Sequence, residues 1–129
     1  MKRILTTVAA MIALATPALA DPAEGIWQTE VDDGKFAFVT VAPCGAAYCG
    51  TISRTFENGG TEYNSPNKGK KIVIDMVANG DGSYEGKVWR PSNNKTYIGK
   101  MSVLGNALTL KGCVAGGLLC AAQSWARVQ

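Results

Sequence analysis

Four cysteines are the residues whose type and spacing point to the clearest chemistry in this chain of 129 residues. They fall into two short pairs, Cys44-x4-Cys49 and Cys113-x6-Cys120. Each pair flanks a short connection, and facing residues of antiparallel strands are close enough for a disulfide. The spacing favours two local disulfides, each stabilising the fold by about 2 kcal/mol. Bridges between the two pairs are the alternative connectivity. The C-x2-C spacing of zinc and redox centres is absent, so we expect no metal site.

Catalytic chemistry has little support in the sequence. Histidine does not occur, which removes the commonest general base and excludes a Ser-His-Asp arrangement. The carboxylates of Asp32, Asp33, Glu57 and Asp81 fall in turn or loop segments, where acidic residues are ordinary. Asp75 lies within a strand pattern and is expected to face solvent. We therefore predict no catalytic residue and no cofactor, and do not expect an enzyme.

The first residues have the pattern of an export signal. Lys2 and Arg3 precede an apolar stretch over residues 4–15, and small residues follow up to Ala20. This pattern predicts a signal peptide over residues 1–20 with cleavage after Ala20. No stretch approaches the roughly 20 apolar residues of a spanning helix, so we expect a periplasmic or secreted protein with no membrane span.

The remaining chain, residues 21–129, is long enough for one domain with a single core. Without Lys2 and Arg3 it carries 11 basic and 10 acidic residues. Proteins that bind nucleic acid usually present a clustered basic face. The lysine run at residues 68–71 is better explained as a solvated loop edge, so no nucleic-acid partner is expected.

Eight short segments with alternating or β-branched patterns follow the predicted cleavage site, most of them joined by turn residues. We expect the first segment to pair with the last, which would remove both sheet edges. The sequence predicts an all-β fold, a small eight-stranded up-and-down antiparallel barrel stapled by disulfides. Residues 57–70 form a long connection, a candidate lid. The strands are expected at Gly25–Val31, Phe36–Ala42, Tyr48–Phe56, Lys71–Val77, Ser83–Arg90, Lys95–Leu104, Ala107–Cys113 and Cys120–Val128.

The two ends of this segment series resemble the lipocalin-like barrels. The resemblance rests on Gly25-Ile26-Trp27 at the start and Trp125-Ala126-Arg127 at the end. In that superfamily a late arginine packs over the tryptophan of a G-x-W motif and closes the base of the barrel. The resemblance implies that Trp27, Trp125 and Arg127 form the barrel closure, with a cation-π contact between Arg127 and Trp27.

A wider pattern is similar to a family of small exported bacterial proteins, known as a domain of unknown function, number twenty-one forty-seven. It includes residues 48–52, 65–70 and 84–97 together with both ends. The resemblance implies a lipocalin-like fold, an envelope location and a small-ligand or binding role. The family usually has D-P-x-N-G-K-x-Y in its central turn, where this chain has Arg90 in place of the aspartate and Asn94 in place of the glycine.

The interior of an eight-stranded barrel is either filled by side chains or holds one small ligand. Gly86 and Gly99 on the presumed inner face either leave volume unfilled or relieve strand bending. Arg54 would be the cation at the mouth, where it could meet a carboxylate headgroup, or it would pair with Glu30 or solvent. A small apolar ligand would contact the side chains expected to point inward, which otherwise fill the core: Ile72, Ile74, Tyr84, Val88, Tyr97, Met101, Leu108 and Leu110.

The outer surface offers a second hypothesis. Trp89 lies between Lys87 and Pro91 and is expected on the outer face, where an exposed tryptophan is a typical interface anchor. It would then contact a protein partner in the cell envelope. The alternative is that Trp89 packs beneath the connection over residues 57–70.

Overall fold

The computed structural model describes residues 20–129, so the predicted signal peptide falls almost wholly outside the described residues. The described chain is built from strands and one short 3-10 helix. None of its helices has the length and apolar character needed to cross a bilayer. The elements are β1 (Gly25–Gln28), β2 (Lys35–Cys44), β3 (Ala47–Glu57), β4 (Glu62–Tyr63), β5 (Lys71–Ala78), β6 (Ser83–Arg90), β7 (Lys95–Leu104), β8 (Ala107–Val114), η1 (Ala115–Gly117) and β9 (Leu119–Arg127).

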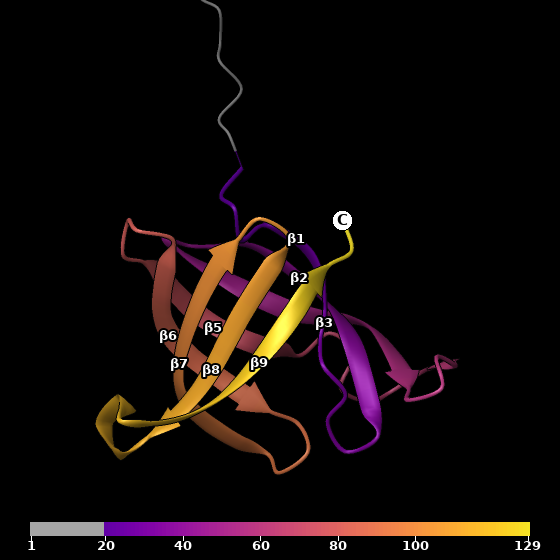
Figure 1. Cartoon of the computed structure of the whole chain (residues 1–129). Helices are drawn as coiled ribbons and strands as arrows, with labels where there is room; N and C mark the ends of the chain where they lie inside the picture. Colours follow the sequence, from indigo (N-terminus) through magenta and orange to yellow (C-terminus); the bar gives the residue numbers. More distant parts are fainter. Residues whose placement is uncertain (1–19) are drawn as a thin grey trace, which may run out of the picture.

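Eight of the strands close into an antiparallel barrel, as predicted. The ring runs β1, β2, β3, β5, β6, β7, β8, β9 and back to β1, and each strand pairs with its neighbour (Figure 1). Trp27 closes the ring because it is paired with Val39 of β2 on one side and with Arg127 of β9 on the other. The short β4 extends the free side of β3 and is the part of the long connection that enters the sheet.

The first strand is shorter than predicted, because the chain leaves β9 after Gln28. Thr29 remains beside β2: its N–H donates to the Ala37 carbonyl at 3.0 Å, and its hydroxyl accepts from the Ala37 N–H at 3.0 Å. The hydroxyl therefore replaces a backbone carbonyl in the ladder. Beyond this point the chain turns through Asp32 and Asp33 at one end of the barrel. By contrast, β6 and β7 have the bounds that the sequence predicted.

Irregular pairing in β3 and β5 changes which side chains point inward. In β3, Val39 is paired with Ile52 and Phe38 with Arg54, so Ser53 is an extra residue. In β5, an irregularity near Ile72 is followed by another between Ile74 and Val77. A bulge of one residue reverses the alternation of every residue beyond it. Alternation read from the sequence therefore fails on these two strands.

The end of the barrel near residue 21, which we call the base, is packed solid. Trp27 and Trp125 are fully buried there, together with Met76 and Leu108. The lead-in over residues 21–24 folds beneath them and fills the space between the strand ends. These buried side chains and the lead-in therefore close the barrel interior at this end.

Arg127 holds the base closed. Its guanidinium carbon lies 4.2 Å from the centroid of the Trp27 ring, as the resemblance implied. The same group donates to the carbonyls of Glu24 at 2.9 Å and Pro22 at 2.6 Å. Trp27 Nε1 donates to the Ala23 carbonyl at 2.9 Å. The last strand is therefore tied to the lead-in both by stacking and by hydrogen bonds.

The two inward glycines do not leave empty space. A Cβ atom on Gly86 would lie 2.5 Å from the Asp75 carbonyl oxygen, and one on Gly99 would lie 2.6 Å from Met76 Cε. Both glycines therefore admit the bulged segment of β5, whose Asp75 has φ of 49°. The structure therefore shows close packing against β5 at these glycines and not unfilled volume.

Candidate ligand-binding cavity

A cavity of about 970 Å³ opens at the end of the barrel opposite the base, which we call the mouth. Its rim is formed by the turn between β1 and β2, the segment over residues 63–67, the turn between β6 and β7, and the hairpin of β8 and β9. These connections lie at the lower end of the barrel in Figure 1, away from the C-terminus. The volume is at the upper end of the range for small-molecule sites, about 300–1,000 Å³.

The inner wall of the cavity is mostly apolar. Four of the residues predicted to contact a ligand line it: Ile72, Val88, Tyr97 and Leu110. Trp125, which belongs to the base core, also reaches the cavity, together with Ile52 and Ala37. Gly112 also lines the cavity, and a Cβ there would make a tight contact with Val88 Cγ1 at 3.3 Å. The four predicted side chains therefore lie where the sequence placed them, inside the barrel, and their contact with a ligand stays a prediction.

Three other residues of the predicted set lie deeper. Tyr84, Met101 and Leu108 are buried in the base core and do not line the cavity. The Tyr84 hydroxyl donates to the Asp21 carboxylate. Burial and this hydrogen bond raise the pKa of Tyr84 above its ordinary value. These side chains face inward as predicted, but at a depth where the lead-in already fills the barrel.

Two predicted ligand contacts are wrong because of the bulges. Arg54 is not at the mouth but on the outer surface, where its guanidinium pairs with Glu62 of β4 at 2.6 Å and lies over Phe38 and Phe56. The hydrogen bonds from Arg54 lower the pKa of Glu62. Ile74 is paired with Lys87 on the outer face of the sheet, because Val73 takes the inward position beside Val88. Neither residue can contact a ligand in the cavity.

A few polar groups interrupt the apolar wall. The Tyr97 hydroxyl accepts from Asn93 Nδ2 at 2.7 Å, which leaves its own hydrogen as a donor. Gln123 Oε1 accepts from Trp125 Nε1 at 2.9 Å, which leaves the Gln123 amide hydrogens for another partner. Lys35 lies on the rim, with its Nζ 4.9 Å from the centroid of the Tyr63 ring. An amphipathic molecule would find hydrogen-bond donors here and apolar surface deeper in.

An ion pair spans the mouth, and sequence reasoning missed it. Arg90, at the end of β6, donates through two nitrogens to the carboxylate of Asp32 at 2.9 and 2.8 Å, and the Ser92 hydroxyl donates to the same group at 3.2 Å. The two turns lie on opposite sides of the ring, separated by β3 and β5 in one direction and by β8 and β9 in the other. We call this contact the mouth bridge. The sequence signal that could have found it is Arg90, which departs from the aspartate in the pattern of the family that the chain resembles.

Trp89 is only half exposed. Lys70 Nζ lies 5.5 Å from the centroid of its ring, and the indole nitrogen donates to Asn94 Oδ1 at 2.9 Å. Lys70 is the last residue of the long connection, so the packing agrees with the alternative that this connection covers Trp89. The ring also borders the cavity. The predicted role as an interface anchor remains a prediction.

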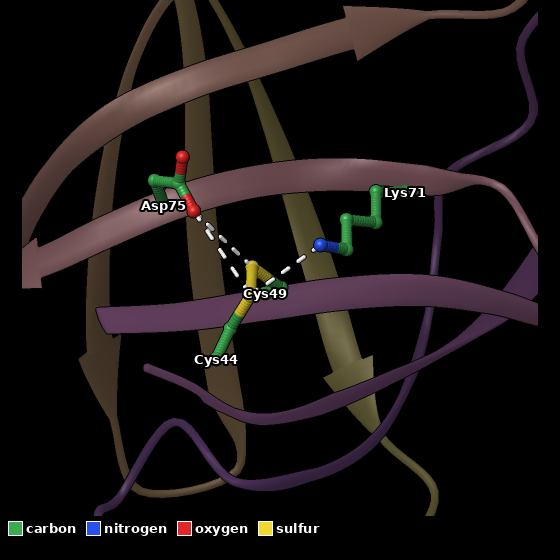
Figure 2. The surroundings of a disulfide bond; sticks show 4 residues. All are labelled: Cys44, Cys49, Lys71 and Asp75. Carbon is green, nitrogen blue, oxygen red and sulfur yellow. Dashed lines mark hydrogen bonds between the residues drawn. A yellow bond between two sulfur atoms is a disulfide. The ribbon is translucent and has the colours of Figure 1, made fainter. Parts of the chain in front are cut away.

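All four cysteines form the two predicted local disulfides, Cys44–Cys49 and Cys113–Cys120. Figure 2 shows the first, with Lys71 Nζ 3.4 Å from Cys44 Sγ and Asp75 Oδ1 3.6 Å from Cys49 Sγ. The two sulfurs and the carboxylate are near enough to share a metal ion. However, cysteine binds metals as a thiolate, and both sulfurs are used in the bridge. Structural disulfides of this kind are typical of extracytoplasmic proteins.

A protein of known structure has a similar fold. Protein HP1028 from the human pathogen Helicobacter pylori, described as belonging to the lipocalin family, is similar to this chain with a TM-score of 0.61. The two share 20% sequence identity over 82% of each chain, so the likeness concerns the fold alone. No curated protein matches the sequence. The family described as "Uncharacterized protein conserved in bacteria (DUF2147)" matches residues 25–127, from the first strand to the last, and the chain belongs to this family.

Proposed function

We propose that this protein binds a small, largely apolar molecule in the mouth half of its barrel. The observation that carries the proposal is the cavity of about 970 Å³ between the mouth and the packed base. Burial of apolar ligand surface stabilises such a complex by about 25 cal/mol per Å². The wall offers a donor at Tyr97 and an amide at Gln123, so the ligand is expected to carry at least one polar group. We infer a binding protein rather than an enzyme.

The proposal predicts that narrowing the cavity will weaken binding. Ala121 lines the cavity and is exposed, and it is paired with Gly112 across the hairpin. We expect Ala121→Phe to fill part of this space and lower the affinity for N-phenyl-1-naphthylamine, an uncharged apolar fluorophore, about tenfold or more because ligand and side chain overlap. The measurement is a fluorescence titration with the purified protein.

The matched control lies on the same strand at the base. Ala126→Phe makes the same change at an exposed position that does not line the cavity, so it should bind the fluorophore like the wild type. Equal affinity of the two variants, or no saturable binding by the wild type, would contradict the proposal. If the wild type binds the fluorophore, native mass spectrometry before and after denaturing delipidation would identify a molecule that co-purifies.

The mouth bridge is expected to slow ligand exchange. Arg90→Ala frees the turn between β1 and β2 from the turn between β6 and β7, so the fluorophore should dissociate several-fold faster in a stopped-flow experiment. Thermal stability should change little, because exposed ion pairs contribute little to it. The control is Arg54→Ala, which breaks the other ion pair of the described chain, on the outer wall. Faster dissociation in both variants would show that the bridge has no special role.

The same bridge gives a pH dependence. The hydrogen bonds from Arg90 hold the pKa of Asp32 below its ordinary value of 3.8. A lowered pKa means that the interaction is complete above 3.8 and is lost as the pH falls below that value. Lys35, bridged to Asp32 through the backbone, and the nearby Glu30 and Asp33 also face this turn. We expect dissociation to accelerate below pH 3.8 in the wild type but not in Asp32→Asn, measured over a pH series.

A role in binding another envelope protein is the other prediction from the sequence. The half-covered ring of Trp89 gives it no specific support. Trp89→Ala with a measurement of thermal stability distinguishes the two roles of this residue, because a packing role predicts a loss of stability.

A further inference from the structure

The tip of the hairpin between β8 and β9 is entirely apolar. Its residues 114–119, Val-Ala-Gly-Gly-Leu-Leu, carry no charged or hydrogen-bonding side chain, and we call them the apolar tip. Leu118 is 86% exposed, Leu119 65% and Val114 48%. The Cys113–Cys120 disulfide lies directly behind the tip and holds its two strands together. Two large leucines are therefore presented to solvent on a rigid, short projection.

The apolar tip is part of the mouth. Val114 and Leu119 line the cavity, so the apolar wall continues outward without interruption onto the tip. Figure 1 shows the hairpin projecting from the barrel at the lower left, away from the C-terminus. Ile98, which is 43% exposed and paired with Cys113, adds apolar surface beside it. Surface of this kind that remains exposed in a soluble barrel usually marks an interaction site.

Basic side chains lie on the outer face of β6, β7 and β8 beside the tip. Lys100 and Lys111 are paired across β7 and β8, and Lys100 Nζ donates to the Gly117 carbonyl at 3.3 Å. Lys87 is paired with Ile98, and Glu85 with Lys100, so three lysines and one glutamate share this surface. Within residues 20–129 none of the four takes part in an ion pair. The local charge is positive and directly adjoins the apolar tip.

We propose that the apolar tip inserts into the surface of an anionic phospholipid bilayer. The leucines enter the boundary between headgroups and acyl chains, and the lysines contact the negatively charged headgroups. A protein partner fits less well, because a stable protein interface needs about 800 Å² from each side and six projecting residues do not offer it. Docking in this way turns the mouth of the barrel toward the lipid. The proposal does not depend on a ligand occupying the cavity.

Sedimentation with phospholipid vesicles tests this proposal. The wild type should bind vesicles of phosphatidylcholine mixed with an equal part of phosphatidylglycerol. The double variant Leu118→Ser/Leu119→Ser should bind about tenfold more weakly or worse, because two leucines no longer leave water. The control is Leu104→Ser, which removes a leucine that is 87% exposed at the base and should bind like the wild type. Absence of wild-type binding, or equal loss in both variants, would overturn the proposal.

The charge component has its own test. Lys100→Gln and Lys111→Gln should each weaken binding to these vesicles about fivefold, and added salt should weaken the wild type in the same way. Vesicles of phosphatidylcholine alone should show no difference between the lysine variants and the wild type. Sedimentation equilibrium without lipid tests the alternative that the apolar tip binds a second copy of the chain. A wild-type dimer that the double leucine variant dissociates would replace the bilayer with a protein interface and refute the proposal.

Discussion

Replacing Trp27 with alanine should lower the free energy of unfolding by about 3–5 kcal/mol, the range for removing a large aromatic side chain from a packed core. Trp27 is fully buried, and its indole nitrogen donates to the Ala23 carbonyl. Its loss leaves a cavity where β1, β2 and β9 meet and removes the surface on which Arg127 packs. Urea unfolding followed by circular dichroism measures the change.

Trp89→Ala is the comparison for that variant. It removes the same side chain from a half-exposed site near the mouth, so we expect a clearly smaller loss of stability. Similar losses for the two variants would mean that the base is not the principal core of the barrel.

Arg127→Ala should be the second most damaging change, at about 3 kcal/mol. Hydrogen bonds from a charged donor contribute about 1.5–3 kcal/mol, and the contact with the Trp27 ring about 0.5–2 kcal/mol. The variant leaves the carbonyls of Pro22 and Glu24 without this donor. Arg127→Lys keeps the charge but not the planar fork, so its loss should be intermediate.

A double-mutant cycle separates the two contributions. If Arg127 acts through the ring, Trp27→Ala and Arg127→Ala should be non-additive, because the second change removes a contact that the first has already broken. Strict additivity in urea unfolding would show that Arg127 stabilises the base through the carbonyls alone.

The first glycine of the G-x-W motif shows why sequence patterns predicted the base so well. Gly25 has φ of 137°, and a Cβ there would lie 2.5 Å from the Gln129 carbonyl oxygen and 2.8 Å from an Arg127 nitrogen. Only glycine fits where the two ends of the sheet meet. The motif therefore specifies the contact that closes the barrel, and this closure determines which strands are neighbours.

The mouth was less predictable, because its geometry depends on bulges and on contacts between distant turns. The expected alternation of inward and outward side chains placed Arg54 and Ile74 inside the barrel. Extra residues in β3 and β5 reverse this alternation. Nothing local marks Ser53 as a bulge. The pairing of Asp32 with Arg90 joins residues 58 positions apart and exists only once the barrel has closed.

The sequence also did not predict how deep each inward side chain lies along the barrel axis. Tyr84 and Tyr97 both face inward on neighbouring strands, yet one is sealed in the base and the other lines the cavity. The difference arises because residues 21–24 fold under the base and bond to Arg127 and Tyr84. A short polar segment before the first strand gives no sequence pattern that predicts this plug.

Pro22 and Arg127 of β9 meet at the base, and the C-terminus lies on the far side of the barrel from the cavity rim (Figure 1). A fluorescent protein, an affinity handle or a surface linker joined at the C-terminus would therefore stand clear of the rim. A molecule immobilised through that point would present its opening outward, toward whatever flows past. Surface-based binding assays with this barrel should accordingly use C-terminal attachment.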